Sequence, residues 1–118
     1  MTAAGFRRIA LALEAAVEGA HHGHADFRVG NRVFATLGYP DTSHGMVSLT
    51  PDQQRTHIRE HPKTFIPVKG KWGEQGATLV HLRSATEEAL GEALTLAWQN
   101  AVAKGPTKGA KKKPRRPG

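Results

Sequence analysis

The chain has 118 residues, enough for one domain built around a single hydrophobic core. It contains no cysteine, which excludes disulfides, thiolate chemistry and cysteine-ligated zinc or iron–sulfur sites. Residues 104–118 hold seven of the 17 Lys and Arg residues and no acid, whereas residues 1–103 carry ten Lys and Arg against ten Asp and Glu. The net charge of +7 therefore belongs to the C-terminal segment, and the rest of the chain is neutral.

Nothing in the sequence predicts a membrane segment or a secretion signal. No apolar run reaches the roughly 20 residues that a membrane helix needs. The N-terminal segment is too rich in alanine to be a signal peptide, and it is interrupted by charges at Arg7, Arg8, Glu14 and Glu18. We therefore expect a soluble cytoplasmic protein without membrane contacts.

The first predicted element is an amphipathic helix that ends near Gly19. Its apolar residues recur at helical spacing, at Phe6, Ile9, Leu13, Val17 and Ala20.

A β-hairpin is predicted over residues 26–37, because two β-branched and aromatic runs flank Gly30-Asn31, a pair that suits a two-residue turn. With a loop of two residues, Val29 faces Arg32 and Phe27 faces Phe34, which places both aromatic rings on one face. A loop of three or four residues would change that register.

A short strand over 46–49 and a second helix follow. Thr50 is the predicted N-cap of this helix, Pro51 its first residue, and Gln53 the reciprocal partner in a capping box. Pro62 ends the helix. Because Ile58 is its one strong apolar residue, we expect a helix that lies on the surface and is mostly in contact with water.

The last third of the chain predicts two strands and a long helix. Pro67 places the strand over 64–68 at a sheet edge, and a glycine-rich hairpin loop over 69–76 leads to a strand over 77–82. Ser84 and Glu87 suggest a capping box for the final helix, which carries Trp98 on its core-facing stripe. Lys104, Gly105 and Pro106 are its stop signals.

The predicted order α-β-β-β-α-β-β-α favours an α+β two-layer sandwich, with an antiparallel sheet of about five strands and helices on one face. This domain spans residues 1–103. The segment 104–118, rich in Lys, Arg, Pro and Gly, lacks the apolar side chains needed to fold and is predicted to be a disordered basic tail.

Five segments, taken in order, resemble the MmcQ/YjbR family. They are HHGHADFRVGNRVFATLGYP, MVSLTPDQQ, HPKTFIPV, KWGEQGATLVHL and the closing helix with Trp98, and together they cover residues 6–103. The resemblance implies a two-layer fold with an antiparallel sheet, similar in topology to type III secretion chaperones. It also implies the "double-wing" shape for which such proteins are labelled DNA-binding, with no established catalytic residues. Ala25 and Asn31 depart from the family pattern, at turns, and the basic tail lies outside it.

The basic tail is the first candidate for nucleic-acid contact, because clustered cations bind phosphates by releasing counterions and do not read sequence. Its candidate residues are Lys104, Lys108, Lys111, Lys112, Lys113, Arg115 and Arg116. No aromatic residue lies among them, so stacking on single strands is not encoded there. A tail that serves solubility, processing or protein interaction is the alternative.

Within the domain, Arg28 and Arg32 flank the first predicted hairpin and could contact phosphates. Equally, one of them could pair with Asp26 across the strands, a contact of about 0.5 kcal/mol on an exposed sheet. In the glycine-rich loop, Lys69 and Lys71 are candidate nucleic-acid contacts. Trp72 beside them could enter a groove, although packing over the end of the sheet is the favoured interpretation.

Metal binding and catalysis find little support. His21, His22 and His24 lie close together, but adjacent histidines on an irregular segment rarely converge on one ion, and a hydrogen-bonded structural role is favoured for His24. Ser43-His44 lacks a recognisable base and orienting group. We expect no metal, no cofactor and no catalytic residues.

The sequence therefore predicts a non-enzymatic DNA-binding protein of weak sequence selectivity, whose affinity for DNA or another polyanion comes largely from the tail. The alternative is a module that binds a protein partner or a small ligand, which the neutral body and the chaperone-like topology favour.

Overall fold

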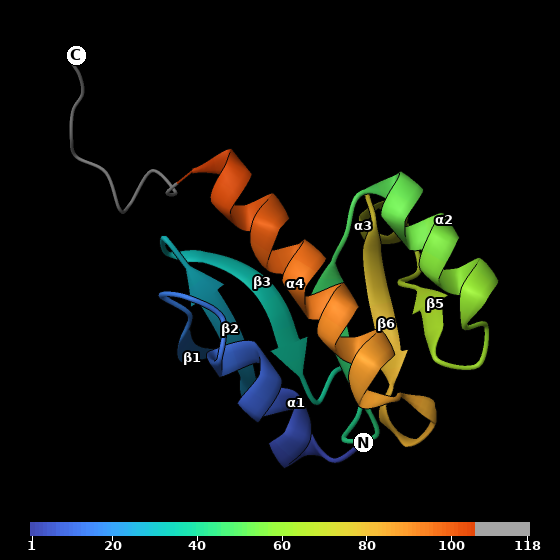
Figure 1. The fold of residues 1–118 in the computed structure, drawn as a ribbon, viewed down its shortest axis with the longest axis horizontal. Helices are drawn as coiled ribbons and strands as arrows, with labels where there is room; N and C mark the ends of the chain where they lie inside the picture. Colours follow the sequence, from blue (N-terminus) through green and yellow to red (C-terminus); the bar gives the residue numbers. More distant parts are fainter. Residues whose placement is uncertain (106–118) are drawn as a thin grey trace.

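The computed structural model describes residues 1–105. They form the expected α+β two-layer arrangement, in which α1 and α4 cross one face of an antiparallel sheet (Figure 1). The sheet has six strands in the order β1-β2-β3-β4-β6-β5. The strands are β1 (Val17–His21), β2 (His24–Val29), β3 (Arg32–Leu37), β4 (His44–Ser48), β5 (Phe65–Pro67) and β6 (Ala77–His81). The helices are α1 (Ala3–Leu11), α2 (Pro51–Glu60), α3 (Lys71–Glu74) and α4 (Glu87–Lys104), with a 3-10 turn η1 (Leu82–Ser84).

The sixth strand, β1, lies where the sequence predicted the end of the first helix. That helix stops at Leu11, and residues Val17–His21 pair with β2 instead. His22 and Gly23, both with positive φ, form the two-residue turn between these strands. Val17 is 56% exposed, so its helical spacing did not reflect a core position. The prediction was wrong because the tight turn at His22-Gly23 folds residues 17–21 back onto β2, and this pairing overrides the helical spacing of the apolar residues.

The turn at Gly30-Asn31 has two residues, both with positive φ, and Val29 pairs with Arg32 as predicted. The predicted pairing of Phe27 with Phe34 is wrong. A β-bulge shifts the register, so that Phe27 pairs with Ala35 and Arg28 with Val33. Both rings still point into the core, and both are fully buried.

Three details of the chain after β3 differ from the prediction. The predicted glycine-rich hairpin loop contains the short helix α3. The cap of α4 is Thr86, whose hydroxyl accepts from the Ala89 N–H, whereas Ser84 belongs to η1. The strand predicted at 46–49 begins at His44 and ends at Ser48. As predicted, Thr50 and Gln53 form a capping box at α2.

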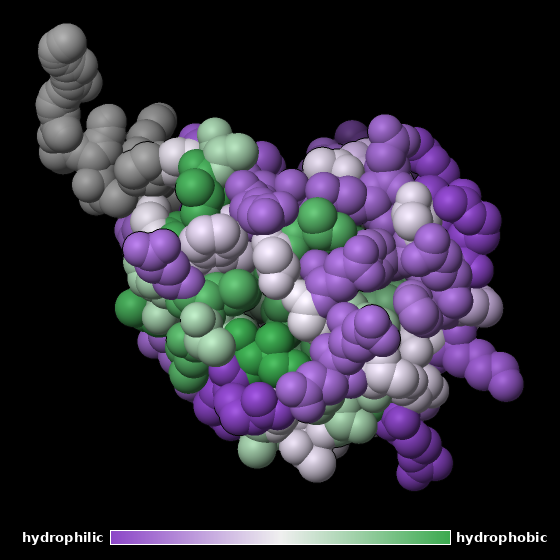
Figure 2. Space-filling view, in the orientation of Figure 1, coloured by the Kyte–Doolittle hydropathy of each residue, from purple (hydrophilic) through white to green (hydrophobic). Residues whose placement is uncertain are grey.

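The core lies between the sheet and the two helices α1 and α4. Its largest fully buried side chains are Phe6, Phe27, Phe34, Phe65, Leu90 and Leu94. Trp98 is partly buried against this core, and its indole N–H donates to the Glu14 carbonyl at 2.9 Å. Figure 2 shows that hydrophilic residues cover the side that carries α2, in keeping with the prediction of a mostly wet helix.

The middle of the sheet is only partly closed. Strands β3 and β4 pair at three positions, from Ala35 with Val47 to Leu37 with Gly45. The first half of β3, from Arg32 to Phe34, therefore has no partner on the β4 side, and an opening forms between the two strands. Among residues 1–105, no helix is both long and apolar enough to cross a membrane.

Candidate functional site

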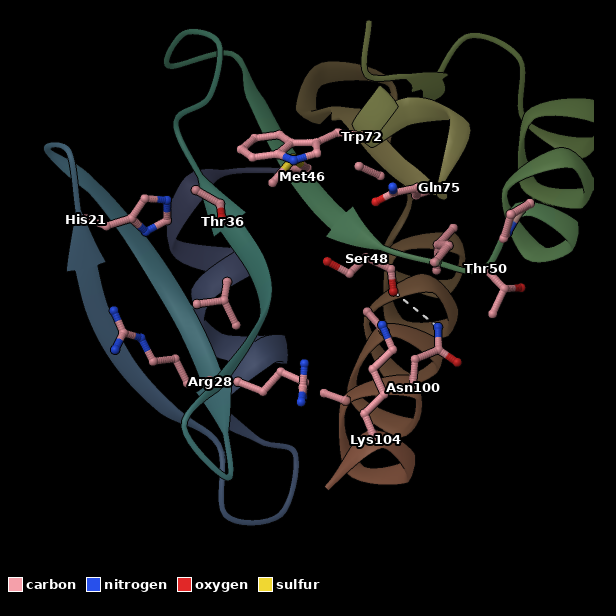
Figure 3. Close-up of a pocket in the computed structure, with 17 residues that line it drawn as sticks. His21, Arg28, Thr36, Met46, Ser48, Thr50, Trp72, Gln75, Asn100 and Lys104 are labelled. Atoms are coloured by element: carbon pink, nitrogen blue, oxygen red, sulfur yellow. Dashed lines mark hydrogen bonds between the residues drawn. The ribbon is translucent and has the colours of Figure 1, made fainter. Parts of the chain in front are cut away.

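A cavity of about 730 Å³ opens beside the partly paired strands β3 and β4 (Figure 3). This is within the size range of sites that hold small molecules. Its lining comes from the first four strands, the start of α2, α3, the loop after α3 and the C-terminal half of α4. Apolar wall residues are Val33, Met46, Leu49, Ala97 and Ala101. We call this site the cationic cavity, because of the charges described next.

Three cations line the cationic cavity: Arg28 from β2, Arg32 from β3 and Lys104 from the end of α4. No Asp or Glu occurs among its lining residues. Arg32 Nε donates a 3.2 Å hydrogen bond to the Gly105 carbonyl, which joins the first hairpin to the end of α4. Each of the three was a sequence candidate for nucleic-acid contact, and the fold brings them to one place.

Arg28 is also held by an acid. Its Nε and NH2 groups donate to the two carboxylate oxygens of Asp26 at 2.7 and 2.9 Å, and His21 Nδ1 lies 2.5 Å from Asp26 Oδ2. The bond from Arg28 lowers the pKa of Asp26, partly offset by burial of this fully buried carboxyl group. In turn, Asp26 raises the pKa of Arg28. Arg28 thus pairs with Asp26, but along β2 and with a buried carboxylate, so the predicted cross-strand pair on an exposed sheet was wrong; Arg32 takes no part in it.

The side chains around Thr36 form one row across the whole sheet. Successive pairs join Gly19 to Asp26, Asp26 to Thr36, Thr36 to Met46, Met46 to Leu79 and Leu79 to Ile66. Thr36 lines the cationic cavity and is only 2% exposed, yet its Oγ1 has no hydrogen-bond partner among residues 1–105. Such a group is rare in a folded protein and points to a missing partner.

Trp72 stands at the cavity rather than over the end of the sheet. The side chain lines the cavity and is 61% exposed, so the favoured packing interpretation was wrong. The α3 segment that carries it is anchored by Gln54, whose Nε2 donates to the Gly73 and Ala77 carbonyls at 3.0 and 2.9 Å. Lys69 and Lys71 are exposed near Trp72 but do not line the cavity.

Of the remaining histidines, His44 lies in a cluster with Asp41 and Ser43. Asp41 Oδ1 accepts from the Ser43 hydroxyl at 2.6 Å and from the Ser43 N–H at 2.9 Å, and His44 Nδ1 lies 2.9 Å from it. Ser43 Oγ also lies 3.0 Å from His44 Nδ1, so the three side chains bond to one another within four residues and close a turn. These bonds lower the pKa of Asp41 to about 2. Within residues 1–105, no three His, Asp or Glu side chains are placed to share a metal ion.

Sequence reasoning found the cations of the site but missed the groups between them. Thr36 and Met46 pair across β3 and β4 at the cavity in a register that follows the unpredicted bulge in β3, and Asn100 reaches the cavity from α4. The His22-Gly23 pair was the available signal for β1. The candidates Lys108, Lys111, Lys112, Lys113, Arg115 and Arg116 lie outside the described residues.

Comparison with known proteins places this geometry in a family. The structure is similar to the crystal structure of Deinococcus radiodurans protein DR2400, which carries a DUF419 domain, with a TM-score of 0.74. The match covers 94% of this chain and 86% of that one at 21% identity, so it shows the fold alone. No curated protein matches the chain. The YjbR family profile matches residues 11–100, and the chain therefore belongs to the YjbR family.

Proposed function

We propose that this protein is a small, cytoplasmic, non-enzymatic DNA-binding protein with little sequence selectivity. One observation carries the proposal: the end of α4, from which the basic segment continues, is tied to Arg32 at the rim of the cationic cavity. A polyanion bound by residues 106–118 would therefore meet Arg32 and Lys104 first on the folded body. Contacts of this kind set position on a phosphate backbone without reading bases.

The charge distribution supports a division of roles. Residues 1–103 are formally neutral, and Arg28 is compensated by Asp26, so the body offers no net positive charge to a polyanion. The cations that follow Gly105 would supply most of the affinity through counterion release. The exposed residues Lys69 and Lys71 would add contacts from the α3 side.

The test compares full-length proteins by fluorescence anisotropy at low salt, with duplex DNA, single-stranded DNA and heparin as ligands. In one variant, the six cations after Gly105 become Gln, which keeps the chain length. We expect its affinity for duplex DNA to fall at least about tenfold. Unchanged affinity would contradict the role of the basic segment, and equal affinity of the unchanged protein for all three polyanions would show attraction to charge without preference for DNA.

The body is tested by the double variant Arg32→Gln/Lys104→Gln, with Arg59→Gln on the exposed side of α2 as the matched control. The double variant should weaken duplex binding about two- to fivefold more than the control. A second candidate function, the binding of a small ligand, is favoured by the apolar walls and by the unpartnered Thr36 hydroxyl.

A further inference from the structure

We propose that the cationic cavity binds a small organic anion that carries a planar aromatic group and one carboxylate. This activity is separate from polyanion binding, because stacked duplex DNA offers no free ring that could enter the cavity. Three features of the cavity favour such a ligand: its two ends differ in chemistry, its cationic end has free hydrogen-bond donors, and its wall holds the unpartnered Thr36 hydroxyl.

The two ends of the cavity differ in chemistry. Figure 3 shows Trp72 and Met46 at one end, and Arg28 and Lys104 at the other. An exposed indole beside a thioether offers a flat, polarizable surface on which an aromatic ring can stack. A ligand that spans the cavity would therefore place its ring at Trp72 and its anionic group near Lys104.

The cationic end has donors to spare. Within residues 1–105, the Arg32 side chain donates one hydrogen bond, from Nε to Gly105, so both of its terminal NH2 groups are free to hold a carboxylate in bidentate fashion. Lys104 is exposed and adds a second charge at the same end. Because no acid lines the cavity, nothing there competes for these two cations.

Thr36 supplies an independent argument. Its hydroxyl is buried, lines the cavity and has no partner in the part of the chain that the structure describes, so it carries a desolvation cost of folding that a bound polar atom would relieve. The hydroxyl both donates and accepts, which suits a phenol or ring nitrogen of the ligand.

The walls are small and fixed. Ala97 and Ala101 present only methyl groups from α4, which leaves room beside the helix. Asn100, between them, donates to the Ser48 carbonyl at 3.1 Å and to Gln53 Oε1 at 2.8 Å, so α4 is locked to the end of β4 and the start of α2. Because these walls are already fixed, binding of a ligand costs little conformational entropy of the protein.

The test titrates 2-naphthoate into the full-length protein and follows amide and indole signals by ¹⁵N NMR. The two tryptophans form an internal control, because Trp72 lines the cavity whereas Trp98 donates to Glu14. We expect a saturable shift of the Trp72 indole and of the Thr36 amide, with the Trp98 indole unmoved. Equal shifts of both indoles, or no saturable shift up to millimolar ligand, would overturn the proposal.

Two comparisons test the chemistry. The uncharged analogue 2-naphthol and inorganic phosphate should each bind at least about fivefold more weakly than 2-naphthoate, since each lacks one half of the recognised ligand. Lys104→Gln and Arg32→Gln should each weaken 2-naphthoate binding about five- to tenfold, and Arg59→Gln should leave it unchanged. Because Lys104 is exposed, its variant folds in any case, and undiminished binding by that variant would refute the assignment of the anionic end.

Discussion

At the scale of single residues, the site is defined by how each polar group is or is not satisfied. Asp26 is fully buried, yet it accepts two hydrogen bonds from Arg28 and lies within bonding distance of His21. The hydroxyl of Thr36, its neighbour across the pair of strands, has no hydrogen-bond partner in the described residues 1–105. The buried carboxylate beside β1 and β2 is thus fully hydrogen-bonded, whereas the buried hydroxyl where the cavity begins is not.

Replacing Thr36 with Val should therefore stabilise the protein. The change keeps the shape of the side chain and removes a buried hydroxyl without a partner, which gives about 1 kcal/mol at pH 7. Urea unfolding of the full-length protein measures this free energy. Thr78→Val is the control, because the equally buried Thr78 hydroxyl donates to the Gly76 carbonyl at 2.8 Å and its loss should destabilise. Destabilisation of similar size by both changes would mean that Thr36 has a partner in solution.

Asp26→Asn should destabilise the protein by about 2 kcal/mol at pH 7, because it leaves Arg28 without its counter-charge in a partly buried position. The pKa of Asp26 is lowered in the folded state from 3.8, so its stabilising effect is full above the unfolded pKa and is lost as the pH falls through the folded one. The difference between wild type and variant, measured by urea unfolding, should thus shrink below about pH 4. Asp52→Asn removes an exposed pair with Arg55 and should change stability by less than about 0.5 kcal/mol. A difference that grows towards acid pH would contradict the sign.

At the scale of the elements, the sequence predicted the features that depend on residues close together in the chain. The capping box at Thr50, the turn at Gly30-Asn31 and the edge position of the strand with Pro67 are confirmed, because each depends on residues within four positions of one another. The bulge that shifts Phe34 and the conversion of residues 17–21 into a strand depend on pairing across the sheet. A single sequence carries that information weakly, and those two features decide which side chains line the cavity.

Gly76→Ala tests how closely the elements approach at the α3–β6 junction. Gly76 has a φ of +114°, and an added Cβ would overlap the carbonyl of Leu49, so we expect a loss of at least about 2 kcal/mol in urea unfolding. Gly91, in α4, has open space around its missing Cβ. Gly91→Ala should stabilise by about 0.5–1 kcal/mol through helix propensity. Similar effects of the two substitutions on the free energy of unfolding would show that the α3–β6 junction has room for a Cβ at Gly76.

At the scale of the whole molecule, the contributions of the neutral body and of the basic segment to DNA affinity should differ in their dependence on salt. Affinity for duplex DNA falls with salt at a logarithmic slope of about −0.9 for each neutralised phosphate. Six cations after Gly105, together with Arg32, Lys69, Lys71 and Lys104, set a limiting slope of roughly −9 for the full chain. Arg28 adds little, because Asp26 already compensates it.

The variant that lacks those six cations should retain a slope of about −4, from Arg32 and Lys104 at the rim of the cavity and from Lys69 and Lys71 near α3. Anisotropy titrations between 50 and 200 mM salt, concentrations over which such slopes are resolved, measure both proteins. A variant whose slope stays as steep as that of the full chain would place the phosphate contacts on the body, where Lys69 and Lys71 become the first residues to change. Addition of 2-naphthoate tests whether the cationic cavity and the basic segment act separately. Because 2-naphthoate competes only for Arg32 and Lys104, it should lower the DNA affinity that remains in the variant. It should leave most of the DNA affinity of the full chain unchanged.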